Sequence, residues 1–339
     1  MGSIFVLSGE DYTFPSAEIR ALVETYSPSS ICENLSTRII HSDLNDTNLI
    51  SKINQRGAYC RFGGWLLSKG SSIEQLSEII GSETIETGKT FVVDSETLDR
   101  PICADLGALI KAKTNASVSL ENPDIVFQLE STGREMVLGM SKDGLKTFTW
   151  RQRRPRARKF FLPSAIFPKL ACLLVNLSRV KEDEYFLDPF CGTGSLLIES
   201  CLMGVNTLGF DLTRWIARGA QMNLKGFSIE NGGVVRADST NSHLPLRFVD
   251  AIATDVPYGR ASSTKGKETK TIIKEFTKAA AEILSASDDT LKRSKYCVLM
   301  RPSEIEFDYD ESAFELCEEH FLYVHRTLTR AISVLRRRS

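Results

Sequence analysis

Short apolar runs alternate with amphipathic segments along the second half of the chain. The runs predict strands at 185–187, 205–210, 234–237, 249–253 and 296–300, and apolar residues at helical spacing predict helices at 195–203, 213–226 and 269–284. This order is typical of right-handed βαβ units in a Rossmann-like, mostly parallel α/β sheet. Two further runs, 314–325 and 328–337, predict an antiparallel terminal hairpin that brings the sheet to seven strands.

The first half of the chain has a less regular pattern, which predicts an α+β region. Its expected strands lie at 4–7, 58–62, 90–93, 125–129 and 136–140, and its expected helices at 16–24, 72–79 and 104–111. A chain of 339 residues is long enough for two domains with separate cores. We therefore expect an N-terminal region over residues 1–150, a basic linker over 151–168 and an α/β domain over 169–339.

Charge divides the chain at the same place. The net charge of −1 conceals 13 Lys and Arg against 20 Asp and Glu in residues 1–150, and 29 against 23 in the remainder. A run of six cations lies within residues 151–159 and could neutralise several phosphates, which predicts contact with nucleic acid. A solvated interdomain linker is the alternative, and a linker beside a substrate cleft would be both. The run consists of Arg151, Arg153, Arg154, Arg156, Arg158 and Lys159.

Several classes of protein find no support in the sequence. The eight cysteines form no C-x-x-C pair and the four histidines no pair at ligand spacing, so we expect no metal site. No stretch approaches about 18 consecutive apolar residues, and the N-terminus lacks the basic lead of a signal peptide. We expect no membrane span and a cytoplasmic location.

The segment Asp188-Pro189-Phe190-Cys191-Gly192-Thr193-Gly194 joins a predicted strand to a predicted helix. Its glycines allow backbone amides to come close to a ligand. Leu197 stands where the dinucleotide fingerprint has its third glycine, which argues against a nicotinamide enzyme. The acid at the start of the turn, Asp188, suits the ammonium and sulfonium groups of S-adenosylmethionine and would repel a phosphate.

Two more carboxylates follow at successive strand ends. Asp211 comes 19 positions after Gly192, where doubly wound folds place the acid that binds a ribose diol. Asp238 is placed to accept a hydrogen bond from the adenine amine. Each acid alone could be a cap or turn residue, but three at successive strand ends favour a binding site. The expected cofactor-binding residues are Asp188, Phe190, Gly192, Gly194, Asp211, Asp238 and Ser239.

The segment Asp255-Val256-Pro257-Tyr258-Gly259 follows the next predicted strand. The exocyclic amine of a nucleobase is a poor nucleophile, because its lone pair is delocalised into the ring. Asp255 and the carbonyl oxygen of Val256 can accept the amine hydrogens and aim that lone pair at a methyl carbon. Pro257 stiffens the loop, and Tyr258 offers a flat face to an extruded base. These four are the expected catalytic residues, although in isolation the same residues could form a turn without function.

Both motifs, together with Arg154–Pro163 and Pro168–Ala171, resemble archaeal tRNA guanosine-10 N2-methyltransferases over nearly the whole chain. The resemblance implies a class I methyltransferase domain that uses S-adenosylmethionine. It also implies a preceding ferredoxin-like region and a THUMP domain that docks tRNA by backbone and shape. Leu106–Ala108 and Leu120–Asp124 are similar to parts of a THUMP domain. A small zinc-containing activator subunit, required by some relatives, is a further partner implied in this way.

One residue departs from the family's Asp-Pro-Pro-Tyr pattern. Val256 replaces the first proline, which frees the backbone φ angle and adds an N–H group that needs a partner. We expect a modest loss of preorganisation, ~0.4–1 kcal/mol. Two alternatives to guanine methylation remain: an adenine N6-methyltransferase acting on other nucleic acid, and a catalytically weak RNA-binding module.

Overall fold

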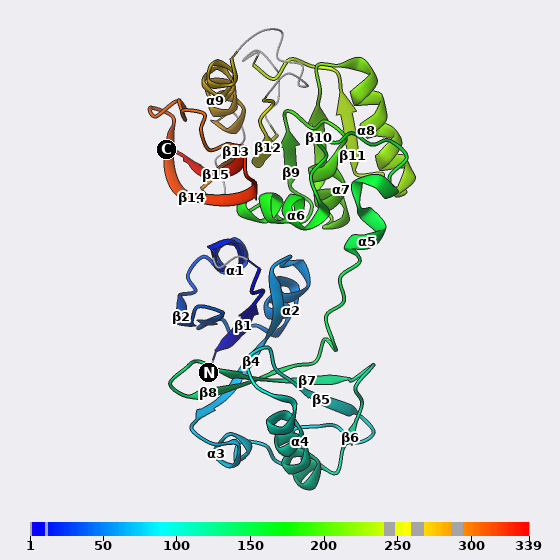
Figure 1. Cartoon of the computed structure of the whole chain (residues 1–339), viewed down its shortest axis with the longest axis vertical. Helices are drawn as coiled ribbons and strands as arrows, with labels where there is room; N and C mark the ends of the chain where they lie inside the picture. The colour runs from blue at the N-terminus through cyan, green and yellow to red at the C-terminus, as the bar shows by residue number, and fades with distance from the viewer. Residues whose placement is uncertain (1, 11–12, 241–247, 259–267, 286–293, 339) are drawn as a thin grey trace. The chain divides into compact units, whose positions relative to one another are not determined.

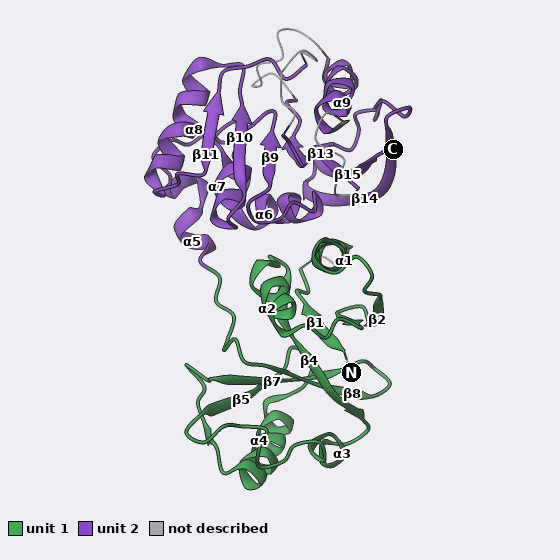
Figure 2. Cartoon of the chain, turned by 180° about the vertical axis from the view of Figure 1, so that it is seen from behind, with its two compact units in different colours: residues 1–148 green, residues 149–339 purple. Residues whose placement is uncertain are grey.

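The computed structural model of the chain describes residues 2–10, 13–240, 248–258, 268–285 and 294–338. The chain divides into two compact units, Met1–Phe148 and Thr149–Ser339, shown in different colours in Figure 2. We call them unit 1 and unit 2 and describe each by itself. The division lies close to residue 150.

Unit 1 begins with a βαββαβ segment. Its elements are β1 (Ser3–Leu7), α1 (Thr13–Tyr26), β2 (Cys32–Ser36), β3 (Ile39–Ser42), α2 (Thr47–Arg56) and β4 (Cys60–Gly70). The strands pair antiparallel in the order β2-β3-β1-β4, which is the ferredoxin-like arrangement. Asp46 caps α2 by accepting hydrogen bonds from the backbone N–H groups of Asn48 and Leu49.

The long strand β4 continues the same sheet into a second region. From Trp65 onward it pairs with β8 (Met136–Ser141), and the order continues through β7 (Ile125–Ser131), β5 (Thr90–Asp94) and β6 (Ser117–Val118). Apolar residues of α3 (Ile73–Ser77) and α4 (Arg100–Thr114) form a core with these strands. Asp124, just before β7, accepts hydrogen bonds from Thr90 N and Oγ1 at 2.8 and 2.9 Å and thereby holds the starts of β5 and β7 together.

Unit 2 has a seven-stranded sheet in the order β11-β10-β9-β12-β13-β15-β14. The strands from β11 to β13 are parallel, and β15 is antiparallel to both β13 and β14. The predicted Rossmann-like sheet with an antiparallel terminal hairpin is confirmed. The strands are β9 (Tyr185–Asp188), β10 (Asn206–Phe210), β11 (Gly232–Val235), β12 (Ala251–Asp255), β13 (Tyr296–Pro302), β14 (Phe314–His325) and β15 (Leu328–Arg337).

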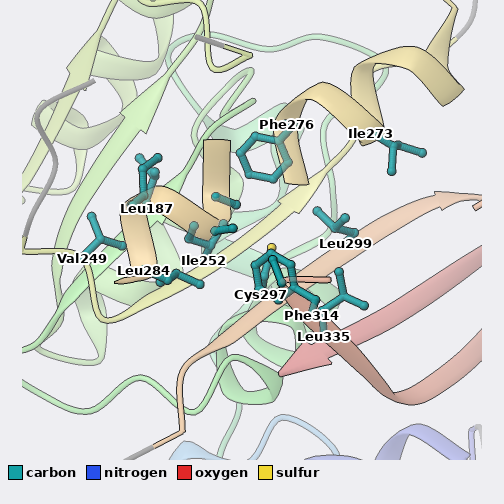
Figure 3. Packing of buried hydrophobic residues seen from close by; sticks show 14 of the residues in the cluster. Leu187, Val249, Ile252, Ile273, Phe276, Leu284, Cys297, Leu299, Phe314 and Leu335 are labelled. Atoms are coloured by element: carbon teal, nitrogen blue, oxygen red, sulfur yellow. The ribbon is translucent and has the colours of Figure 1, made fainter. Parts of the chain in front are cut away.

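Helices cover this sheet and close its cores. They are α5 (Trp150–Arg153), the short 3₁₀ helix η1 (Pro155–Ala157), α6 (Pro168–Leu177), α7 (Ser195–Leu202), α8 (Arg214–Gly226) and α9 (Thr269–Ser285), most of them labelled in Figure 1. One core packs α9 on the central strands. Figure 3 shows Phe276 of α9 near Leu187, Ile252 and Leu299 of β9, β12 and β13. None of the helices in the described ranges combines the length and apolar composition needed to cross a bilayer.

The strand β9 pairs with β10 on one side and with β12 on the other. Sequence order therefore reverses beside β9, which makes this the topological switch point of the sheet. In doubly wound folds a ligand binds in the crevice outside the carboxyl ends of the strands at such a point. The expected ligand-binding position is therefore at the carboxyl ends of β9, β10 and β12, and both sequence motifs lie there.

Candidate active site

A cavity of about 350 Å³ lies at these strand ends. Its size is within the usual range of small-molecule sites, roughly 300–1,000 Å³. The cavity is lined by ten of the eleven residues expected for cofactor binding and catalysis: Asp188, Phe190, Gly192, Asp211, Asp238, Ser239, Asp255, Val256, Pro257 and Tyr258. Both motifs therefore face one common space.

The turn after β9 depends on its two glycines. Gly192 has a φ of +50° and Gly194 a φ of +81°, which residues with a side chain rarely adopt. Gly194 does not line the cavity and instead caps α7. The backbone N–H of Cys191 donates to Phe210 O at 2.8 Å and so fixes the turn against the end of β10.

Asp188 is the most deeply buried acid of the site, with 2% of its surface exposed. Its Oδ1 accepts hydrogen bonds from Thr254 Oγ1 at 2.6 Å and from Phe190 N at 3.2 Å. Burial nevertheless raises the pKa of Asp188 to about 7, because two hydrogen bonds do not replace full hydration of the carboxylate. A cationic ligand in the cavity would restore the charged form, so Asp188 fits an ammonium-bearing donor.

The other two acids expected to bind the cofactor, Asp211 and Asp238, both line the cavity and take part in turns. Asp211 Oδ1 accepts from Thr213 N at 2.7 Å, and burial raises the pKa of Asp211. Asp238 Oδ1 accepts from Thr240 Oγ1 at 2.7 Å. Ser239 is 4% exposed, and its hydroxyl donates to Pro189 O at 2.5 Å, so this side chain ties the loop after β11 to the turn after β9.

Asp255 ends β12 with its carboxylate in the cavity. Its Oδ1 is buried and has no hydrogen-bond partner among the residues that the structure describes. Its Oδ2 lies 3.6 Å from Arg330 Nη2. Burial raises the pKa of Asp255 to about 6, and Arg330 opposes that rise. One carboxylate oxygen is thus left to accept a hydrogen bond from a substrate.

Arg330 of β15 also positions the tyrosine of the motif. Its Nη2 donates to Tyr258 Oη at 2.6 Å, and its Nη1 lies 3.8 Å from Met300 Sδ. The guanidinium carbon is 5.7 Å from the centre of the Tyr258 ring. One arginine therefore connects the acid and the aromatic face of the same loop.

The backbone N–H group that Val256 adds to the motif has a partner. It donates to Met300 O at 2.9 Å, so the hydrogen bonds between β12 and β13 continue one residue beyond Asp255. The Val256 side chain is 1% exposed and packs in the core with α9 residues. A strand hydrogen bond and core packing hold the loop at the position where the family resemblance implies a proline. Gly259 lies outside the described residues.

The basic run divides into two groups. Arg153 donates through Nε and Nη2 to both carboxylate oxygens of Glu199, at 2.9 and 3.0 Å. Arg158 is 7% exposed and donates to Ser195 Oγ at 2.7 Å, and burial lowers its pKa to about 10. These two arginines are engaged within unit 2, which differs from the expected role in phosphate binding. The exposed members are Arg151, Arg154, Arg156 and Lys159.

Residues 151–168 also differ from a simple linker. The backbone of Phe160 exchanges two hydrogen bonds with the Asn223 side chain, at 2.8 and 2.9 Å. Asn223 Nδ2 also donates a hydrogen bond, of 2.9 Å, to the Thr193 carbonyl oxygen in the turn after β9. Farther along, Leu162 and Ile166 line the cavity. This segment is therefore packed on unit 2 and builds one wall of the site.

Sequence reasoning missed Thr254, Arg330, Leu162 and Ile166. Thr254 directly precedes Asp255 at the end of an apolar run, so a polar residue there was the one available signal. Arg330 comes 75 positions after Asp255, and no spacing rule connects the two. Leu162 and Ile166 belong to a segment without periodicity.

The comparisons with known proteins agree with this geometry. The family described as UPF0020, RMKL-like methyltransferase domain, matches residues 155–295. The tRNA (guanine(10)-N2)-dimethyltransferase of Methanothermobacter thermautotrophicus is 35% identical over 246 residues, which cover 72% of this chain and 70% of the relative. The protein of the same name from Methanocaldococcus jannaschii is 29% identical over 369 aligned positions, covering 98% and 99%.

Solved structures show the same fold at low identity. TrmN from Thermus thermophilus superposes with a TM-score of 0.53 at 16% identity, covering 99% of this chain and 100% of that chain. SMU.472, a methyltransferase structure in complex with SAH, has a TM-score of 0.50 at 12% identity, covering 98% and 97%. Taken with the sequence relatives and the geometry of the site, the chain belongs to the tRNA (guanine(10)-N2)-dimethyltransferase family.

Proposed function

We propose that this chain transfers a methyl group from S-adenosylmethionine to the exocyclic N2 amine of guanosine at position 10 of tRNA. One observation carries the proposal: Asp255 lines the same cavity as Asp188, Asp211 and Asp238, the three acids expected to bind the cofactor. Among the described residues, the Oδ1 of Asp255 has no hydrogen-bond partner. A carboxylate oriented toward an amine and a site for a cationic methyl donor are the two parts that such a transfer requires. Family membership supplies the nucleotide and the atom.

The residues present fit the donor. Asp188 holds a buried carboxylate whose pKa of about 7 makes a cation its natural partner. Asp211 directly follows β10 and Asp238 comes three residues after β11, and both line the cavity. These positions support binding of the ribose diol by Asp211 and of the adenine amine by Asp238. Bound S-adenosylmethionine would supply the methyl group. The chain's own contribution is to hold the donor and to orient the acceptor amine.

The acceptor loop would act mainly by positioning. Asp255 Oδ1 accepts a hydrogen bond from one N–H of the amine, and the carbonyl oxygen of Val256 accepts a hydrogen bond from the other. These two hydrogen bonds direct the nitrogen lone pair toward the methyl donor. The hydrogen bond to Asp255 strengthens as the nitrogen gains positive charge, so it stabilises the transition state more than the ground state. Tyr258, held by Arg330, presents its ring to the guanine.

Unit 1 would bind the tRNA. Its ferredoxin-like segment and the adjoining THUMP-like region support docking of the acceptor end by shape. The exposed cations of the basic run, Arg151, Arg154, Arg156 and Lys159, would contact phosphates. Action on tRNA is consistent with the cytoplasmic location expected from the sequence. A zinc-containing activator subunit stays a prediction.

Mass spectrometry of nucleosides tests the proposal. A tRNA transcript with guanosine at position 10 is treated with the whole chain and S-adenosylmethionine, beside a transcript with adenosine at that position. N2-methylguanosine, with or without the N2,N2-dimethyl product, is expected from the first transcript alone. Equal methylation of both transcripts, or N6-methyladenosine as the product, would contradict it. An absence of any product would favour a non-catalytic RNA-binding module.

A further inference from the structure

We propose that the exposed face of α8 is a second RNA-contacting surface, on which an unpaired nucleotide near the target stacks on Trp215 while neighbouring phosphates lie along a row of cations. The inference rests on the proposed function, because it assumes an RNA substrate. We call this area the α8 surface; it consists of Lys159, Arg214, Trp215, Arg218, Lys225 and Arg236, all exposed.

The charge of this surface has one sign. Neither α8 nor the segment 149–169 contains an aspartate or a glutamate. Arg214, Arg218 and Lys225 are spaced by four and seven residues and so lie on one side of the helix. Because Lys225 lies 11 positions after Arg214, the helix carries these charges over about 17 Å. A cationic row of this length matches a nucleic-acid backbone better than it matches a point-charged small ligand.

The basic run and α8 form one continuous surface. A Cβ atom added to Gly219 would lie 2.1 Å from the Phe160 ring, and one added to Gly226 would lie 3.4 Å from Lys159 Cδ. The chain from Lys159 to Phe160 therefore runs along α8 from its last residue toward its first turn. Figure 1 and Figure 2 both show α5 and α8 on the β11 side of the sheet.

An aromatic side chain stands where this row meets the cavity. Trp215 is 57% exposed, and the Phe160 ring packs edge-on against it with centroids 5.7 Å apart. The next residue, Ile216, lines the cavity, as does Leu212 just before the helix. A large indole exposed beside a ligand site and surrounded by cations is the combination that single-stranded nucleic acids bind, by base stacking and phosphate contacts.

Substitutions in the whole chain separate stacking from charge. Trp215→Leu removes the aromatic face, Trp215→Phe keeps one, and Arg218→Gln with Lys225→Gln removes two charges. Matched controls are Lys278→Gln, an exposed cation of α9, and Phe321→Leu, an aromatic of β14 that is 53% exposed. Each variant is measured for tRNA affinity over a salt series by filter binding, and for S-adenosylmethionine affinity by calorimetry.

Trp215→Leu should weaken tRNA binding roughly tenfold, and Trp215→Phe should restore most of that loss. The charge variant should flatten the plot of log affinity against log salt by about 0.7 for each phosphate that the chain no longer neutralises. Both controls should bind tRNA as the unaltered chain does. Donor affinity should not follow the tRNA affinity, because Trp215 does not line the cavity.

The two possible failures can be told apart. If the unaltered chain methylates tRNA while all α8 variants bind tRNA normally, the α8 surface is not an RNA site and the proposed function stands. If the unaltered chain neither binds nor methylates tRNA, the proposed function fails, and this inference fails with it.

Discussion

Two acids that line the cavity, Asp188 and Asp255, both lack full electrostatic compensation. Among the described residues, Asp188 has two hydrogen-bond donors but no cation beside it, and Asp255 has Arg330 at 3.6 Å and an Oδ1 with no partner. Burial raises the pKa of each. A buried carboxylate that is not fully paired destabilises the fold, so its presence beside a cavity indicates a role in ligand binding.

Replacing Asp188 should therefore separate stability from binding. A group whose folded-state pKa is raised from 3.8 to about 7 loses stabilising free energy as the pH rises between those values, and the loss is complete above the folded-state pKa. Asp188→Asn removes the charge while its oxygen can still accept from Thr254. We expect its melting temperature without ligand to rise at pH 8, by roughly 2–4 °C per kcal/mol regained.

The same variant should bind S-adenosylmethionine at least about tenfold more weakly, a difference of about 1.4 kcal/mol. Differential scanning calorimetry at pH 5 and pH 8 and isothermal titration with the donor provide the two measurements. Asp211→Asn is a comparison within the same cavity: it should also weaken donor binding, because its carboxylate is expected to bind the ribose diol. Unchanged donor affinity in Asp188→Asn would refute the assignment.

Arg330 should set the pH dependence of turnover through Asp255. Among the described residues, the charged or titratable groups around Asp255 are Arg330 of β15, Asp188 of β9 and Tyr258 of its own loop. The carboxylate must be ionised to accept from the amine, so the single-turnover rate should fall as the pH drops through about 6. Because Arg330 lowers the pKa of Asp255, Arg330→Met should move this fall to higher pH, and Arg330→Lys should move it less.

Single-turnover rates from pH 5 to 8.5 at saturating donor and tRNA test this shift. Asp255→Asn is the reference without a titrating group, and its rate should be close to zero at every pH. Arg330→Met could lower the rate at every pH without moving the fall in rate to higher pH. That result would mean that Arg330 only orients Tyr258. Arg330 could act in that way because it donates a hydrogen bond to Tyr258 Oη, a contact separate from its interaction with Asp255.

Most residues of the two motifs could be located from the sequence because strand ends, glycine turns and acids lie close together along the chain. Arg330 could not, because β15 comes beside β12 and β13 only through the pairing of distant strands. Arg153 and Arg158 look identical to their neighbours in the sequence, and only packing on α7 distinguishes them. Tertiary contacts decide these positions, and local pattern does not reveal them.

At the scale of elements, prediction succeeded where the pattern was periodic or bounded by turns. The expected hairpin 314–325 and 328–337 is confirmed residue for residue, and the helix expected at 269–284 extends over Thr269–Ser285. The strand expected at 249–253 lies at Ala251–Asp255, so that Asp255 is its last residue. The strand expected at 234–237 lies at Gly232–Val235. Glycines lower strand propensity, which obscured its start.

Several elements were not predicted at all. The helix α6 is buried on nearly every side, and its continuous apolar run lacks the polar face that reveals a helical period. The strand β2, with sequence CENLS, is a polar edge strand, for which alternation gives little signal. The helix α2 has an amphipathic pattern and an Asp46 cap, so both usual signals were present and were overlooked.

The contact between α8 and the segment before α6 gives a prediction at this scale. Gly219→Ala would place a Cβ atom 2.1 Å from the Phe160 ring, and the ring cannot easily retreat because Asn223 holds the Phe160 backbone. Overpacking typically costs about 1–3 kcal/mol, which exceeds the gain of roughly 1 kcal/mol from replacing a helical glycine. We expect lower stability and weaker donor binding, since Leu162 of the same segment lines the cavity.

Gly226→Ala is the matched control for that substitution. It is also a glycine of α8, but the nearest atom to its added Cβ is Lys159 Cδ at 3.4 Å, on a flexible side chain. Its stability should be equal to or slightly above that of the unaltered chain. Thermal unfolding and donor titration of both variants decide the matter, and equal behaviour of the two would show that Phe160 does not hold this wall of the cavity.

At the scale of the whole molecule, each unit has its own core and its own balance of charge. Among the described residues, the apolar clusters of unit 1 consist of residues before 149, and those of unit 2 of residues after it. Acids exceed bases in residues 1–150, and bases exceed acids in the remainder. Recognition of tRNA by unit 1 would thus depend on shape and local contacts, whereas unit 2 has the surplus of positive charge for phosphates.

Because of this division, unit 2 should fold and bind the methyl donor without unit 1. Residues 149–339 contain every residue that lines the cavity, together with the segment 149–168 that forms its wall. Expressed alone, this part should fold and bind S-adenosylmethionine as the whole chain does, while the KM for tRNA rises at least about a hundredfold, or about 2.7 kcal/mol, from the loss of unit 1. Circular dichroism, donor calorimetry and steady-state methylation supply the measurements. A folded fragment with an unchanged KM for tRNA would show that unit 1 does not dock the substrate, and a folded fragment that fails to bind the donor would show that the site depends on unit 1.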